Sequence, residues 1–468
     1  MKNRYQSRTI SVLKWAWVLL PVILSVILLS ACNTGGGSST TPETLVVVWN
    51  SNVELDGAGA DWDIFFSRST DGGATWSALE VLNSNAASDG TSDDYFPVAM
   101  TDGNGTWVAV WDSTAVIDGG GTDYDILFSR STDDGVTWSG PHLLDPTAIS
   151  GTGSDQMPVL MTDGSGTWVT VWRSGEDFNS AGTDRDIFFS RSTDNGLTWS
   201  ASQLIDSTAI SGTGEDRLPS VMTDGKGTWV TVWRSSEDFN DAGTDNDIFF
   251  SRSIDDGENW SASEVLNSAN ADSDHRPVVM TDGNGTWVTA WFSNEDLDSA
   301  GTDPDIFFSR STDGGLTWSG QQTLNSNAST DGSAEDWHPV LMTDGEGTWI
   351  AAWNYWDGST DYDLQFARST DGGENWSTQQ TLNSNAAQIT GAGWGNGMDI
   401  RPILVPLGAD IWTAVWQSNE DVSGTGTDYD IFFSRSINGG TSWSASQPLN
   451  SNAATDTGDE DDQFGDMD

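Results

Sequence analysis

After the first 31 residues, six arginines stand outside the Asp-Ile-Phe-Phe-Ser-Arg-like segments that recur along this sequence, and their chemistry suits the binding of an anion. They are Arg173, Arg185, Arg217, Arg234, Arg276 and Arg401. A guanidinium group donates a planar fork of hydrogen bonds that matches a carboxylate. Arg217, Arg276 and Arg401 precede a proline at related places in three repeats. We expect these three side chains to converge on one ligand carboxylate.

The loops around these arginines are acidic, which leaves a second interpretation open. Each arginine would then pair with a neighbouring carboxylate such as Glu176, Glu237 or Asp274, without any ligand. Both interpretations stand at the level of sequence.

Clustered carboxylates in the same loops suggest a calcium site. The pair Glu295-Asp296 precedes the element Gly301-Thr302-Asp303-Pro304-Asp305, and carboxylates with backbone carbonyls are the ligands that Ca²⁺ prefers. We therefore expect a calcium ion near Glu295, Asp296, Asp303 and Asp305. No complete Asp-x-Asp-x-Asp-Gly loop is present, so solvated acid, as in an adaptation to salt, is the alternative.

An internal repeat positions all of these residues. The motif Ser-x-Asp-x-Gly-x-Thr-Trp ends at Trp76 and recurs about every 60 residues until Trp443. Its acidic position is occupied by Asp71, Asp133, Asp194, Asp255, Asp313, Asp371 and Asn438. The Asp can accept from nearby backbone N–H groups and the Gly supplies a positive φ, so a turn explains the motif without catalysis.

Each repeat contains four strand-like segments. They read like Pro277–Met280, Thr167–Trp172, Asp186–Arg191 and a segment from the motif Trp to a Leu-Asn pair. The second segment is apolar on both faces, which is typical of a strand covered on both sides. Four short antiparallel strands in seven repeats predict an all-β, seven-bladed β-propeller. The first repeat lacks an obvious first strand, so six blades plus a three-stranded fragment is the alternative. A row of Ig-like sandwiches needs more strands per unit.

Because the strands of a blade are antiparallel, successive loops alternate between the two faces of such a propeller. The recurring motif lies between the third and fourth strands on one face. The six arginines fall on the other face, together with His275, Trp337, His338 and Trp394. Because binding groups concentrate on variable loops of a rigid scaffold, we expect the ligand site on this second face.

The motif resembles the Asp-box, or BNR repeat, of sialidases and their relatives, and seven copies cover nearly all of residues 44–450. The resemblance implies that the box is structural. It also implies that a sialidase would hold its substrate with three arginines, an Asp acid/base and a Tyr–Glu nucleophile pair. Asp216-Arg217-Leu218-Pro219 distantly resembles the sialidase Arg-Ile-Pro motif but lies in the middle of the chain. No complete catalytic set is recognisable. The first hypothesis is therefore a propeller that binds glycan or protein ligands without catalysis. An exo-α-sialidase or related glycoside hydrolase is the alternative, and calcium-dependent adhesion ranks third.

The first 31 residues have the pattern of a secretory signal. Residues 1–14 are basic, residues 15–29 are apolar, and small residues follow. Leu29-Ser30-Ala31-Cys32 resembles the bacterial lipobox, in which the Cys is lipidated. We expect a tether over residues 32–43, the propeller over 44–450 and an acidic tail over 451–468. The expected location is the bacterial cell envelope, on the outer membrane or cell surface, with Cys32 as the membrane anchor.

The net charge excludes several partners. The chain carries 18 Lys and Arg against 70 Asp and Glu, a formal charge of −52. Such a surface repels phosphate backbones, so nucleic acid is not an expected partner. The single Cys excludes an internal disulfide.

Overall fold

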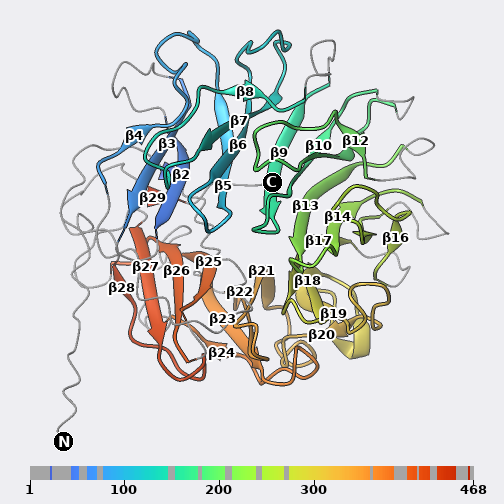
Figure 1. Ribbon diagram of the computed structural model, residues 1–468. Helices are drawn as coiled ribbons and strands as arrows, with labels where there is room; N and C mark the ends of the chain where they lie inside the picture. The colour runs from blue at the N-terminus through green and yellow to red at the C-terminus, as the bar shows by residue number, and fades with distance from the viewer. Residues whose placement is uncertain are drawn as a thin grey trace, which may run out of the picture.

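The structure is a computed structural model in which seven antiparallel sheets surround a central axis (Figure 1). It describes residues 22–23, 44–51, 61–70, 77–145, 153–177, 182–205, 213–238, 245–267, 273–358, 362–383, 398–407, 410–421, 430–448 and 462–463. Cys32, Asp71 and Trp394 lie outside these ranges. The predicted seven-bladed β-propeller is confirmed. Within the described residues, no helix is long and apolar enough to cross a membrane.

The blades repeat one order of strands, which we name A to D from the axis outward. Strand A is β5 (Asp94–Thr101), β9 (Asp155–Thr162), β13 (Asp216–Thr223), β17 (Asp274–Thr281), β21 (Glu335–Thr343) and β25 (Asp399–Pro406). Strand B is β2 (Leu45–Ser51), β6 (Trp107–Ser113), β10 (Trp168–Ser174), β14 (Trp229–Ser235), β18 (Trp287–Ser293), β22 (Trp349–Trp356) and β26 (Trp412–Ser418).

The outer strands complete each sheet. Strand C is β3 (Asp63–Ser69), β7 (Asp125–Ser131), β11 (Asp186–Ser192), β15 (Asp247–Ser253), β19 (Asp305–Ser311), β23 (Tyr362–Ser369) and β27 (Asp430–Ser436). Strand D is β4 (Glu80–Val81), β8 (His142–Leu143), β12 (Gln203–Leu204), β16 (Glu264–Val265), β20 (Gln322–Thr323), β24 (Gln380–Thr381) and β28 (Gln447–Pro448). One 3₁₀ turn, Leu297–Ser299, follows β18.

Blade one has three strands among the described residues, in the order β2-β3-β4. The sequence likewise shows no first strand for this repeat. A separate parallel pair joins β1 (Val22–Ile23) to β29 (Asp462–Gln463). Since β1 lies in the predicted leader, cleavage before Cys32 would remove this pair.

Strand B forms the core between neighbouring blades. All seven residues of β10 are buried, and the indoles of Trp168 and Trp172 are almost completely buried. The side chains of a strand alternate between its two faces. Each strand B therefore fills both blade junctions with Trp and aliphatic side chains, which explains its two-sided apolar pattern.

The recurring strand C arginines connect successive blades. Arg130 Nε donates to the carbonyl of Asn195 at 2.5 Å, and Arg310 Nε donates to Gly372 at 2.6 Å. Each acceptor lies in the Asp-box turn of the next blade. These arginines are framework residues, but their partner is a backbone oxygen rather than a carboxylate.

The Asp-box side chains hold their own turns. Asp133 accepts from the backbone N–H of Thr137 at 2.9 Å and from its hydroxyl at 2.7 Å. These bonds lower the pKa of Asp133, as expected for a carboxylate that accepts several hydrogen bonds. Asp194, Asp255, Asp313 and Asp371 accept equivalent bonds, and Asn438 accepts the backbone bond.

Strand A begins three residues earlier than the sequence suggested. In five blades its first residue is an Asp three positions before the proline, and in β21 that Asp is the second residue. In four blades this Asp accepts from a strand B indole, as Asp274 does from Trp291 at 2.8 Å. The residue before the proline has φ of 49–59° in all six blades, and the register shifts there. This β-bulge redirects one side chain per blade.

Candidate functional site

Among the described residues, the predicted binding residues other than Arg185 lie at strand ends rather than in loops. Arg217 pairs with Arg234 across β13 and β14, and His275 pairs with Phe292 across β17 and β18. The bulge positions of blades five, six and seven are Arg276, His338 and Arg401. These residues lie in strands instead of the predicted loops because strands A and B continue past the bulge. The described ones lie at the end of the ring opposite the Asp-boxes.

Glu215 is the carboxylate that the structure places among these arginines. Its Oε2 atom accepts from Arg185 Nη1 and from Arg217 Nη2, each at 3.1 Å. These two guanidinium groups lower the pKa of Glu215 against the opposing effect of burial. Sequence analysis did not single out Glu215, because a Glu in an acidic loop carries no distinguishing pattern.

Arg173 is more deeply buried, with 8% of its surface exposed, and its Nη2 donates to Gln156 Oε1 at 3.1 Å. Burial, with Arg185 and Arg217 nearby, lowers its pKa to about 10. The buried carboxyl of Asp112 also interacts electrostatically with Arg173. Burial raises the pKa of Asp112 to about 8, so this group is mostly uncharged at neutral pH.

Arg234 and His275 are in direct contact. Arg234 Nη1 donates to His275 Nδ1 at 2.9 Å, and the imidazole stacks on Phe292 with ring centroids 5.1 Å apart. A guanidinium group has no lone pair to offer, so Nδ1 must accept and the imidazole proton resides on Nε2. Burial and the charges of Arg234 and Arg276 lower the pKa of His275 to about 4.

A parallel arrangement surrounds His338. Asn354 Oδ1 accepts from the backbone N–H of Arg401 at 3.0 Å, which orients the amide so that Nδ2 faces His338 Nδ1 at 3.2 Å. His338 Nδ1 therefore accepts, and its proton also resides on Nε2. Burial, Arg276 and Arg401 lower the pKa of His338 to about 3.

The result is an arc of hydrogen-bond donors, which we call the arginine arc: Arg173, Arg217, Arg234, His275, Arg276, His338 and Arg401. Electrostatic coupling links its neighbours, since Arg217 and Arg276 both lower the pKa of Arg234 after burial. Within the described part of the chain, neither Arg173 nor Arg234 lies within ion-pair distance of a carboxylate. A buried charge without a counter-charge is costly, which is the condition that an anionic ligand relieves.

The acids proposed as alternative partners have other contacts. Glu176 Oε1 accepts from the backbone of Gly153 at 2.7 Å, and Glu237 Oε1 accepts from Gly214 at 2.5 Å. Asp274 accepts from Trp291 and from Asn267. These contacts fix loops and strand ends.

Aromatic side chains lie beside the arc. Trp337 packs on Phe292 with ring centroids 4.9 Å apart, and its Nε1 donates to Glu335 at 3.1 Å. Tyr95 and Tyr124 lie near the Asp112 end of the arc, and their ring centroids are 6.3 Å apart. Burial and nearby carboxylates raise the pKa of Tyr95 to about 12, which opposes activation of a Tyr nucleophile.

Two groups of three carboxylates could hold a metal ion. They are Asp61, Asp63 and Asp89 in blade one, and Asp303, Asp305 and Asp331 in blade five. The structure therefore groups Asp303 and Asp305 with Asp331 instead of the expected Glu295 and Asp296. Glu295 accepts from Gln321, and Asp296 accepts from the backbone of Gly301 at 3.2 Å.

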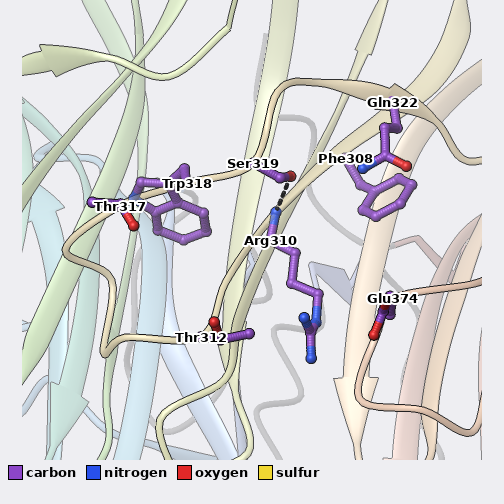
Figure 2. Close-up of a pocket in the computed structure, with 8 residues that line it drawn as sticks. All are labelled: Phe308, Arg310, Thr312, Thr317, Trp318, Ser319, Gln322 and Glu374. Atoms are coloured by element: carbon purple, nitrogen blue, oxygen red, sulfur yellow. Dashed lines mark hydrogen bonds between the residues drawn. The ribbon is translucent and has the colours of Figure 1, made fainter.

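An open groove of about 410 Å³ lies on the Asp-box side of the ring, between blades five and six. Figure 2 shows Arg310 between Ser319, whose hydroxyl accepts from the Arg310 backbone, and Glu374 of the next blade. An equivalent groove beside Arg252 and Trp260 occurs one blade earlier. A groove that recurs with the framework arginine belongs to the scaffold, so we place the candidate site at the arginine arc.

Comparison with known families agrees with the repeat pattern. Residues 43–296 match the family model of the BNR repeat-like domain. This chain belongs to the BNR repeat-like family. No curated protein matches the sequence.

Solved structures with the same fold are distant in sequence from this BNR-repeat propeller. An ulvan lyase, a polysaccharide lyase, is 13% identical over 80% of this chain and 87% of its own, with a TM-score of 0.50. A Hadza microbial sialidase is 16% identical over 80% and 73%, with a TM-score of 0.42. A Penicillium chrysogenum α-L-arabinanase is 16% identical over 66% and 85%, with a TM-score of 0.41.

Proposed function

We propose that this propeller binds an acidic glycan at the arginine arc without cleaving it. The observation that carries the proposal is the pair of guanidinium groups, Arg173 and Arg234, that have no carboxylate partner within the described residues. The chain as a whole carries −52, so carboxylates are abundant, yet among the described residues none lies within ion-pair distance of Arg173 or Arg234. A uronate carboxylate or a sulfate ester would supply the missing counter-charge.

A sugar suits the groups beside the arc. Trp337 and Phe292 offer apolar ring surface next to charged donors, and the Nε2–H groups of His275 and His338 can donate to hydroxyl oxygens. The ulvan lyase of the same fold was solved with a -[GlcA(1-4)Rha3S]- ligand. That repeating unit combines a carboxylate with a sulfate and provides a concrete probe.

The protonation states favour binding over catalysis. A general base needs a free lone pair, and the contacts of His275 and His338 place a proton on the outward nitrogen of each ring. Glu215 is held as a carboxylate by two arginines and is a poor proton donor. Tyr95, Tyr124, Tyr355 and Tyr362 all have raised pKa values. A sialidase nucleophile would need the opposite shift.

The proposal includes a location outside the cytoplasm. Lipidation of Cys32 would tether the propeller through residues 33–43 to the outer membrane or cell surface, where glycans are accessible. Replacing Cys32 by Ala should move the protein from the membrane pellet to the soluble fraction and abolish incorporation of labelled palmitate. Unchanged fractionation and labelling would contradict the anchor.

The test of function compares binding with turnover. Calorimetry with a glucuronate–rhamnose-3-sulfate oligosaccharide should show binding, and its carboxyl-reduced, desulfated counterpart should bind at least about 10-fold more weakly, since a charge-assisted hydrogen bond is worth about 1.5–3 kcal/mol. Mass spectrometry should find the oligosaccharide intact. A fluorogenic sialoside tests the alternative: release that disappears in Arg276→Ala would establish the sialidase and overturn the binding-only proposal.

A further inference from the structure

Two blades carry the same three-carboxylate arrangement near the arginine-arc end of the ring. In blade one, Asp61 and Asp63 meet Asp89, and in blade five, Asp303 and Asp305 meet Asp331. Within each group, one oxygen from every carboxylate lies within 4.8 Å of the others. The first two acids lie at the start of strand C and the third comes from the D–A loop, so each cluster joins two parts of one blade.

The loop that supplies the third acid has a defined turn. Both loops share the sequence Asn-Ser-Asn-Ala-x-x-Asp-Gly. The backbone N–H of Asp89 donates to the carbonyl of Asn85 at 3.1 Å, and Asp331 donates to Asn327 at the same distance. This turn directs the third carboxylate back toward the Asp-x-Asp pair.

Buried oxygens without partners provide the second observation. Asp63 and Asp305 have no exposed surface. Their Oδ1 atoms accept from Asn83 at 2.9 Å and from Asn325 at 2.6 Å. Their Oδ2 atoms are buried and accept no hydrogen bond from any described residue. The same holds for both oxygens of Asp61 and both of Asp331. Buried carboxylate oxygens are normally paired, so something else must satisfy these atoms.

We propose that each cluster binds one Ca²⁺ ion, in blade one through Asp61, Asp63 and Asp89 and in blade five through Asp303, Asp305 and Asp331. The donors are all oxygens, which suits a hard cation, and three carboxylates give the strong negative charge that Ca²⁺ sites use. The ion would fasten the D–A loop to strand C.

The direct test counts bound ions. Purified full-length protein is titrated with CaCl₂ by calorimetry after removal of metal, and the number bound is confirmed by equilibrium dialysis. Asp89→Asn and Asp331→Asn should each lose one ion, and the double variant should lose two. The last repeat carries acids at the corresponding positions Asp428, Asp430 and Asp456, although Thr457 replaces the Gly of the loop pattern. The number of ions lost in each variant, rather than the total number bound, therefore decides the test.

Asp245→Asn is the matched control. Asp245 is the blade-four counterpart of Asp61 and Asp303, but six residues after Asn267 its shorter D–A loop has Ser273, where the other two loops have Asp89 and Asp331, and no cluster forms there among the described residues. This variant should keep the full number of ions. Thermal melts provide a second readout: EDTA should lower the Tm of the wild-type chain more than that of the double variant. Unchanged ion numbers in both single variants, or equal numbers lost in Asp245→Asn, would overturn the proposal. MgCl₂ in place of CaCl₂ should bind more weakly, and equal affinity would reject the assignment to calcium.

Discussion

Arg234 donates from Nη1 to Nδ1 of His275 at 2.9 Å, and this single contact fixes which nitrogen of the imidazole carries the proton. The guanidinium group cannot accept, so His275 presents an N–H group at Nε2. Asn354 fixes the proton of His338 in the same way, because its Nδ2 group donates to Nδ1 of that ring. The arc is therefore rich in hydrogen-bond donors, and the proposed recognition of an anion rests on this property.

Binding of an acidic glycan should depend little on pH between 5 and 8. The pKa of His275 is about 4 and that of His338 is about 3, so both remain neutral until the pH falls through those values. Uronate and sulfate groups stay ionised over the same range. Calorimetry at pH 5, 6.5 and 8 should give dissociation constants within about threefold. Affinity that rises strongly toward pH 5.5 would mean that a histidine gains charge there, contrary to its contacts.

The association rate for the same ligand should rise with salt. The chain carries −52, so an anionic oligosaccharide is repelled at long range before it reaches the arc. Raising the ionic strength from about 0.01 M to 0.15 M shortens the Debye length from about 30 Å to about 8 Å and screens that repulsion. Stopped-flow measurements should show the increase. A rate that falls with salt would indicate that the local field of the arginines steers the ligand.

Metal-free protein should lose stability as the pH rises from 6.5 to 8. Burial raises the pKa values of Asp63 and Asp305 to about 7 and of Asp112 to about 8. The unfolded chain has already released these protons, so the folded state binds more of them and its stability falls with rising pH. The lowered pKa values of His275 and His338 make the stability rise with pH, but only below about pH 6.5, the pKa of a histidine in the unfolded chain.

The measurement is the Tm in EDTA at pH 6.5, 7.25 and 8, compared with the variant Asp63→Asn/Asp305→Asn. The wild-type Tm should fall across the series, and the slope should be shallower in the variant. An equal dependence of Tm on pH in the two proteins would contradict the assignment of this effect to the protons of Asp63 and Asp305.

Gly315→Ala should destabilise the propeller more than Gly164→Ala. Both glycines have positive φ, 76° and 71°, so each substitution costs about 1 kcal/mol of backbone strain. A Cβ atom on Gly315 would also lie 2.7 Å from Val230 in the neighbouring blade, whereas at Gly164 the nearest atom is 3.7 Å away. The clash should add about 1–3 kcal/mol. Urea denaturation of both variants measures the difference in the free energy of unfolding. Equal losses of stability would show that the blade junction shifts to accommodate the added Cβ atom.

The fold was predictable because its signals are local and repeated. The Asp-box turn and the two-sided apolar strand B recur often enough to identify a propeller without knowledge of any contact. The start of strand A was missed because an Asp followed by two variable residues and a proline has the composition of a turn. Only the contact of Asp274 with Trp291 shows that the Asp belongs to the sheet.

For the candidate site, the sequence indicated residue types and a face of the ring, but not which side chains contact one another. Arg217, Arg276 and His338 were identified as candidates, yet nothing in the sequence shows that the residue before the proline takes a positive φ. The partner of Asp303 and Asp305 was sought at Glu295, nearby in the chain. The structure places Asp331 there, because a loop between strands D and A returns it to the start of strand C. Such pairings depend on tertiary contacts that sequence spacing does not encode.

The most direct test of the proposed function is the affinity of Arg173→Gln/Arg234→Gln for the glucuronate–rhamnose-3-sulfate oligosaccharide, measured by calorimetry beside Arg310→Gln. Arg310 bonds to the carbonyl of Gly372 on the Asp-box side, so its replacement controls for a general loss of stability. The account predicts at least about 10-fold weaker binding for the double variant, from the loss of charge-assisted hydrogen bonds. It predicts unchanged binding for Arg310→Gln. Equal affinity in the double variant and the wild-type protein would contradict the arginine arc as the binding site.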